Sequence, residues 1–89
     1  MSTELGSDMA LKAIVHVGLK PGVLDVQGKA VANALQGLGF VDVEDARVGK
    51  VIEIDMAGQD RAAAYDKVRE MCESLLANTV IESYRVEIA

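Results

Sequence analysis

Val48-Gly49-Lys50-Val51 is the stretch on which the predicted fold depends. It separates two runs whose composition predicts β-strands, residues 43–48 and 51–56. Glycine at the first position of a two-residue turn adopts a positive φ at no steric cost, as a tight type II′ hairpin requires. One strand pattern and one helix pattern lie on each outer side of these runs. The sequence therefore predicts two βαβ halves joined by a hairpin at Gly49-Lys50.

The first half begins with strict alternation. Residues 12–19 have a period of two, which predicts a half-buried strand. The side chains expected to face the core are Ala13, Val15, Val17 and Leu19. After a turn at Pro21-Gly22, Asp25 is a suitable N-cap for a helix over residues 26–36. Gly28 inside that helix indicates a close approach of another backbone segment. The expected core-facing stripe of the helix is Val31, Ala34, Leu35 and Leu38.

The second half repeats the order of strand, helix and strand. The strand at 51–56 alternates regularly, whereas the strand at 43–48 needs a bulge near Glu44-Asp45 to keep its apolar residues on one face. Asp60 is expected to cap a helix over residues 61–77, and the last strand covers residues 81–88. The expected inward stripe of this helix is Tyr65, Val68, Cys72, Leu75 and Leu76.

The resulting order, β-α-β-β-α-β, is typical of the ferredoxin-like fold, an α+β two-layer sandwich. It predicts a four-stranded antiparallel sheet with two helices on one face. Residues 9–89 would form a single domain, and residues 1–8 a flexible N-terminal extension. The sheet face without helices mixes charged residues with Ile14 and Val51. A partly apolar, uncovered face of this kind is a candidate protein–protein surface.

Composition narrows the class of function. With 89 residues, 51% of them hydrophobic, the chain is expected to fold as one small domain whose marginal core favours a partner protein or a homo-oligomer. A net charge of -5 and only 3% aromatic residues argue against nucleic acid as a partner. No apolar run approaches the ~20 residues of a membrane span. A single Cys precludes an internal disulfide and fits a cytoplasmic location.

Few residues could support catalysis. Cys72 and His16 are the only thiol and imidazole, but the predicted strand and helix phases place them on opposite sides of the sheet. The glycines have neither the spacing of a phosphate loop nor that of a dinucleotide-binding loop. We therefore expect no catalytic residue, no metal site and no cofactor on this chain, and predict a binding or assembly module.

Three stretches together resemble the PurS subunit family of phosphoribosylformylglycinamidine synthase. They are Val-Leu-Asp-Val-Gln-Gly at 23–28, Arg-Val-Gly-Lys at 47–50, and the long run from Met71 to Arg85. The resemblance extends from about Leu11 to Ile88, nearly the whole chain. One departure is Val26, which stands where the family often has a proline that would fix φ at the first helical position.

This resemblance implies a small, non-catalytic subunit that dimerises and bridges two larger ones in purine biosynthesis. A glutaminase subunit, PurQ, would release ammonia from glutamine. A synthetase subunit, PurL, would use ATP and Mg²⁺ to convert formylglycinamide ribonucleotide (FGAR) to its amidine (FGAM). The uncovered sheet face would form the dimer through Ile14, His16, Val51, Glu53 and Arg85. The first turn and the hairpin would contact the larger subunits through Lys20, Pro21, Gly22, Asp25, Arg47, Gly49 and Lys50.

Two other families share the predicted βαββαβ order. Pro21-Gly22-Val23-Leu24 resembles the turn of ACT domains, regulatory modules that bind amino acids near that position. Micromolar binding of an amino acid by the isolated chain would favour this alternative. Acylphosphatases have a similar fold but need an Arg in the first strand–helix loop, and residues 20–25 contain none.

Overall fold

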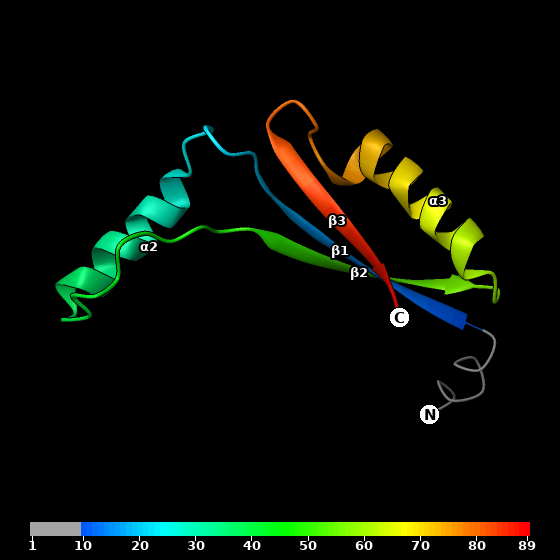
Figure 1. Ribbon diagram of the computed structural model, residues 1–89, viewed down its shortest axis with the longest axis horizontal. Helices are drawn as coiled ribbons and strands as arrows, with labels where there is room; N and C mark the ends of the chain where they lie inside the picture. Colours follow the sequence, from blue (N-terminus) through cyan, green and yellow to red (C-terminus); the bar gives the residue numbers. More distant parts are fainter. Residues whose placement is uncertain (1–9) are drawn as a thin grey trace.

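The computed structural model describes residues 10–89 and contains a sheet and two separate helices (Figure 1). In chain order the elements are β1 (Ala10–Leu19), α2 (Val26–Gly37), β2 (Lys50–Ala57), α3 (Arg61–Met71) and β3 (Glu82–Ile88). A π-helical segment, η1 (Cys72–Leu76), continues α3. The predicted extension at residues 1–8 lies outside the described residues.

The sheet has the order β2-β1-β3, with both neighbouring pairs antiparallel. β1 is central, and its Val15 lies opposite Ile52 of β2 and Val86 of β3. The alternation predicted for β1 is confirmed, because Ala13, Val15 and Val17 are all buried on one face. Val15 forms the middle of that face, which is the face that α3 covers.

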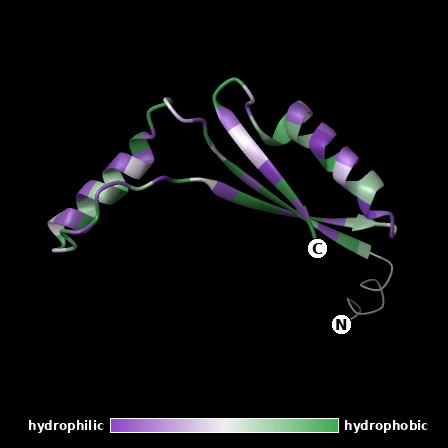
Figure 2. Cartoon of the chain, in the orientation of Figure 1, coloured by the Kyte–Doolittle hydropathy of each residue, from purple (hydrophilic) through white to green (hydrophobic). Residues whose placement is uncertain are grey.

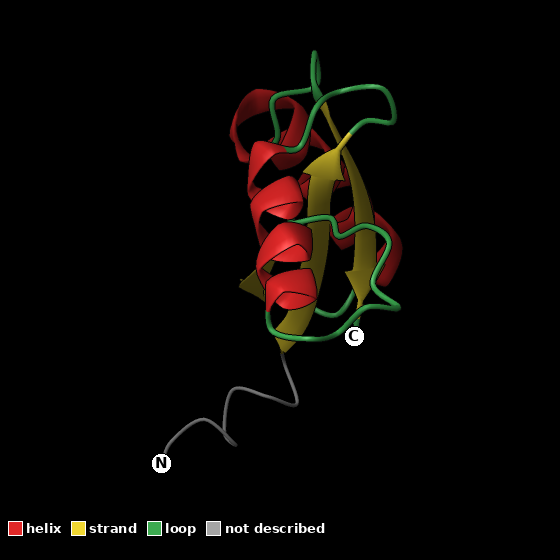
Figure 3. Cartoon of the chain, turned by 90° about the vertical axis from the view of Figure 1, so that its left-hand side faces the viewer, coloured by secondary structure: helices red, strands yellow, loops and turns green. Residues whose placement is uncertain are grey.

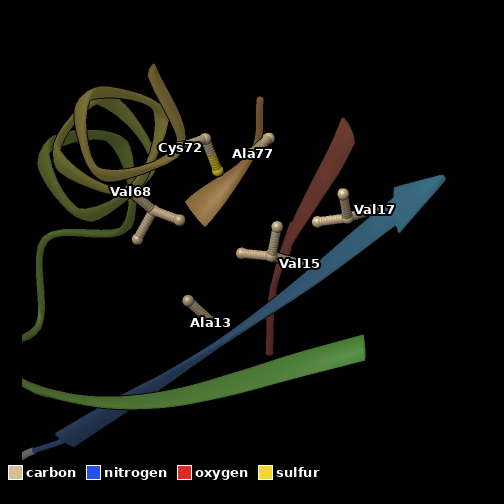
Figure 4. Close-up of a cluster of buried hydrophobic side chains, with 6 residues drawn as sticks. All are labelled: Ala13, Val15, Val17, Val68, Cys72 and Ala77. Carbon is tan, nitrogen blue, oxygen red and sulfur yellow. The ribbon is translucent and has the colours of Figure 1, made fainter. Parts of the chain in front are cut away.

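α3 begins at Asp60, whose carboxylate accepts a hydrogen bond from the Ala63 amide at 3.1 Å, as a helix N-cap does. The helix packs against β1 and β3, and the core is one cluster drawn in Figure 4. Val68 and Cys72 point from the helical segments toward Val15 and are fully buried. Their predicted inward orientation is therefore confirmed.

Two residues of the predicted α3 stripe do not face the sheet. Tyr65 is 41% exposed and Leu75 is 83% exposed. The π-helical turn, closed by the hydrogen bond from the Ala77 amide to the Cys72 carbonyl, explains Leu75. A wider turn rotates the residues that follow Cys72 around the helix axis, so that Ala77 enters the core and Leu75 turns outward.

The predicted four-stranded sheet is wrong, because the described sheet has three strands and residues 43–48 belong to none of them. This segment instead runs alongside α2, as Figure 3 shows. The Gln36 side chain donates to the Val43 carbonyl at 2.7 Å, and the Val48 amide donates to the Asp25 carboxylate at 2.8 Å. The irregular spacing of its apolar residues therefore reflects packing against a helix rather than a bulged strand.

The predicted hairpin at Gly49-Lys50 is also wrong. Gly49 is not among the glycines with positive φ, which in the described chain are Gly22, Gly39 and Gly58. A Cβ atom on Gly49 would lie 2.6 Å from the Val17 carbonyl oxygen. Glycine is required here because the backbone passes close to β1, and not because the chain turns.

α2 and the segment that returns along it project from the sheet as an arm, defined here as residues 20–49 (Figure 1). The molecule extends 48 Å along its longest axis, whereas a compact chain of this length would be about 30 Å across. Only Gly28 and Ala32 of α2 are buried, and Val31 and Leu38 are 42% and 75% exposed. The prediction that the α2 stripe faces the sheet is therefore wrong.

Candidate functional site

The base of the arm is organised around the Asp25 carboxylate. Asp25 caps α2 by accepting from the Gly28 amide at 2.8 Å, and it accepts a second hydrogen bond from the Val48 amide at the same distance. The residue is only 8% exposed. Both donors favour the charged form, so they lower the pKa of Asp25, with the Val48 amide as the larger cause and the Arg47 charge as a smaller one.

Close packing below this carboxylate fixes the two sides of the arm. A Cβ atom on Gly28 would collide with the Ala46 carbonyl oxygen and would lie 2.7 Å from the Asp25 carboxylate. The close backbone approach predicted at Gly28 is therefore confirmed. The Arg47 guanidinium donates to the Leu19 carbonyl at 3.1 Å, which ties the returning segment to the end of β1.

The seven residues predicted to contact larger subunits gather at the arm base. Two of them already have roles inside the chain, since Asp25 bonds backbone amides and Gly49 permits the approach to Val17. Pro21, Gly22, Arg47 and Lys50 are exposed, and Lys20 is half-buried with its amide bonded to the Ile81 carbonyl at 2.8 Å. Contact between these residues and another subunit remains a prediction.

Two shallow hollows flank the arm base. One of about 320 Å³ is lined on the α2 side by Gly22, Lys29, Asp45 and Arg47 among others. The other, of about 220 Å³, lies at the sheet side and includes Gln27, Lys50 and Glu82. Their linings carry both charges and no thiol or imidazole. The mixed apolar and charged linings suit docking of a protein segment better than chemistry.

The five residues predicted for the dimer lie together on the face opposite α3, here called the outer face. In the register, His16 lies between Val51 and Arg85, and Ile14 lies opposite Glu53. Val51 is 58% exposed and supplies apolar surface beside Ile14. The structure thus brings all five side-chain positions together, as the sequence predicted, while their contact with a second copy remains a prediction.

Ion pairs make this outer face largely polar. Lys12 Nζ lies 3.2 Å from Glu53 Oε1, and Arg85 pairs with Glu87. The Arg85 partner is the main reason that the pKa of Glu87 is lowered. His16 Nε2 lies 3.5 Å from Glu87 Oε2 and makes no hydrogen bond within the described residues. The face therefore offers less bare apolar surface than the sequence pattern suggested.

Cys72 and His16 do not form a catalytic pair. Cys72 is fully buried between α3 and the sheet, and His16 lies on the outer face. Burial raises the pKa of the Cys72 thiol, which keeps it protonated and a poor nucleophile. Residues 10–89 contain no group of three or more His, Cys, Asp or Glu placed to hold a metal ion. Over the same range, no helix is long and apolar enough to span a membrane.

Sequence reasoning missed the apolar surface of the arm, which Figure 2 shows as green segments along α2 and its loop. Its large exposed residues are Leu24, Val26, Val31, Leu38, Phe40 and Val41, of which Val41 is 84% exposed. The apolar stripe of α2 was visible in the sequence. Its exposure was not, because the stripe was assigned to a sheet that the helix does not contact.

These features define a class, a small α+β docking module that presents a projecting arm and an open sheet face. The chain belongs to the PurS family, whose model, described as Phosphoribosylformylglycinamidine (FGAM) synthase, matches residues 12–89. The resemblance noted in the sequence is confirmed.

Characterised relatives agree with this assignment. The chain is 49% identical to phosphoribosylformylglycinamidine synthase subunit PurS of Bacillus subtilis, over 86% of this chain and 90% of that protein. Its fold matches the crystal structure of Methanocaldococcus jannaschii PurS with a TM-score of 0.81 and 37% identity, over 89% and 95% of the two chains. It also matches a chain of the structure of PurLQS from Thermotoga maritima, with a TM-score of 0.82 and 29% identity over 90% and 98%.

Proposed function

We propose that this chain is the small, non-catalytic subunit that joins a PurL-type synthetase to a PurQ-type glutaminase. The observation that carries the proposal is the match to a chain of the Thermotoga maritima PurLQS structure over nearly the full length of both chains. In this assembly the glutaminase releases ammonia from glutamine. The synthetase binds ATP and Mg²⁺ and converts FGAR to FGAM in the cytoplasm.

The chemistry of the chain supports a structural role. Its single thiol lies in the core with a raised pKa, and its single imidazole lies across the sheet from it. The conspicuous surfaces are the arm and the outer face, which present apolar and charged groups suited to protein contacts. These properties favour assembly over bond-making on this chain.

A homodimer is the second part of the proposal. α3 packs on β1 and β3, so that Ile52, Ile54 and Met56 of β2 stay partly exposed on the helix side of the sheet. The arm projects away from the sheet (Figure 1), and its loop exposes Leu38 and Phe40. A second copy related by two-fold symmetry would bury both apolar surfaces, because the arm of each copy would then cover the β2 side of the other. The five outer-face residues remain a second proposed contact.

Reconstitution tests the function. Glutamine-dependent FGAM formation by purified synthetase and glutaminase should require this chain. Free ammonia in place of glutamine is the matched control, because it bypasses the glutaminase and should depend much less on the chain. Equal glutamine-dependent rates with and without the chain would contradict the proposal.

Two substitutions separate the proposed dimer surfaces. Phe40→Asp places a charge on the arm, and Val51→Asp places one on the outer face, at residues that are 54% and 58% exposed. Sedimentation should show a wild-type dimer that dissociates in the Phe40→Asp variant, since burying an unpaired carboxylate is costly. Dissociation by Val51→Asp alone would assign the dimer to the outer face instead. A wild-type protein that stays monomeric would contradict both contacts.

A further inference from the structure

Asp25 differs from the other helix-capping aspartate. The Asp60 carboxylate accepts from the amide of Ala63 three residues ahead, and it is exposed. The Asp25 carboxylate makes the equivalent bond to Gly28 and adds a bond to Val48, 23 residues further along the chain. Among the described residues, Asp25 is the one buried charged side chain. A buried carboxylate without donors would be costly, and here two amides stabilise the charge.

The second bond connects the two ends of the arm. Asp25 begins α2, and Val48 ends the returning segment just before Gly49 and β2. Farther out, the Ala46 carbonyl packs on Gly28 and the Gln36 side chain bonds the Val43 carbonyl. The arm is therefore closed along its length, and the Asp25 bond lies nearest to the sheet.

Little else holds the arm against the sheet. α2 makes no extensive packing contact with a strand. At the base, the Arg47 guanidinium bonds the Leu19 carbonyl from an exposed position, and the Lys20 amide bonds the Ile81 carbonyl. The direction in which the arm leaves the sheet thus depends on how its two ends are held together at Asp25 and Val48.

We infer that Asp25 is a positioning residue for assembly, whose carboxylate fixes the orientation of the arm relative to the sheet through the Val48 amide. The residue is only 8% exposed, and its two carboxylate oxygens are occupied by amides of its own chain. It acts by presenting the exposed apolar residues of α2 and its loop in one orientation, which lowers the entropic cost of binding. This inference rests on the proposed assembly role and adds to it the residue that controls presentation of the arm.

Serine substitution separates the two bonds of Asp25. Serine is as good an N-cap as aspartate, so Asp25→Ser keeps the bond to the Gly28 amide. Its shorter side chain with a single oxygen cannot also reach the Val48 amide. Asp60→Ser is the matched control, because it makes the same change at a helix cap with no second backbone bond.

Amide hydrogen exchange and sedimentation measure the outcome. In Asp25→Ser the Val48 amide should exchange at least tenfold faster than in wild type, with unchanged protection of the β1 amides. Its affinity for a second copy and for the synthetase subunit should fall at least tenfold, whereas Asp60→Ser should assemble like wild type.

Assembly of Asp25→Ser with wild-type affinity would overturn the inference, as would an equal loss in Asp60→Ser. Should Asp25→Ser fail to fold, Asp25→Asn gives the same test, because its amide nitrogen cannot accept from Val48. A wild-type chain that assembles with nothing would instead contradict the proposed function, and Val48 exchange would still decide whether Asp25 holds the arm.

Discussion

Gly49 lies where the chain leaves the arm and enters β2, and its missing side chain decides how closely two backbone segments pass. The Val17 carbonyl oxygen occupies the space that a Cβ atom would need. Gly18, one residue further along β1, has open space at the equivalent position. Two neighbouring glycines thus have opposite tolerance for a methyl group.

We predict that Gly49→Ala destabilises the fold by about 1–3 kcal/mol, because overpacking forces the backbone of β1 or β2 to shift. Gly18→Ala is the control and should be neutral or stabilising by up to about 1 kcal/mol, since alanine reduces the entropy of the unfolded chain. Urea unfolding measures both. Equal stability of the two variants would contradict the steric assignment.

Asp25 makes the molecule sensitive to acid. Its pKa is lowered in the folded state by the Val48 and Gly28 amides, relative to about 4 in an unfolded chain. The stabilisation is therefore complete above pH 4 and is lost as the pH falls through the lower, folded-state value. We expect the melting temperature to drop, as the pH falls below about 4, by more in wild type than in Asp25→Asn. Parallel pH profiles of the two proteins would argue against this assignment.

At the scale of elements, the two helices differ in what they pack against. α3 contributes Val68 to the core, whereas α2 buries only Gly28 and Ala32 and packs on no strand. Local stability follows buried contacts. In the isolated monomer, α2 amides should exchange with solvent faster than β1 amides, and dimer formation should slow them. Hydrogen exchange at low and high protein concentration tests this, and uniform protection of α2 and β1 at low concentration would contradict it.

Local interactions explain what could be predicted at this scale. Asp25 and Asp60 cap their helices through amides three residues away, and β1 alternates because of its own pleat. The register of the sheet, by contrast, and the partner of residues 43–48 depend on segments distant in sequence. Apolar residues with irregular phase, here Val43, Ala46 and Val48, suit a helix neighbour as well as a strand neighbour, which is why the fourth strand was predicted wrongly.

In the candidate site, too, local features could be predicted from the sequence and contacts between distant segments could not. Sequence reasoning placed the predicted subunit contacts at two turns, of which only the one at Pro21-Gly22 exists, and the fold brings both segments together at the arm base. It predicted Asp25 as a helix cap but could not show the second bond to the Val48 amide, since Val48 was assigned to a strand. It also assigned Val31 and Leu38 to an intramolecular core, because a sequence does not show whether an apolar face is covered by its own chain.

At the scale of the whole molecule, the proposed dimer predicts that a second copy supplies part of the stabilising burial that the extended shape lacks. Association stabilises the folded state by mass action, so the apparent stability should rise with protein concentration. A hundredfold increase is expected to add about 2.7 kcal/mol to the unfolding free energy of a dimer and to raise its melting temperature by several degrees. Phe40→Asp should abolish this dependence. Calorimetry of wild type and Phe40→Asp at two protein concentrations checks both expectations. A wild-type melting temperature that does not change with concentration would contradict the dimer.

The limit of three strands in the described sheet has a consequence for a cell that makes this chain in excess. β2 and β3 both form margins of the described sheet, where main-chain groups can recruit further strands and seed aggregation. The two strands carry regularly spaced charges, among them Glu53 and Asp55 on β2 and Arg85 and Glu87 on β3. Replacing such residues by neutral ones would remove a safeguard against insoluble deposits whenever synthesis outpaces the supply of partners.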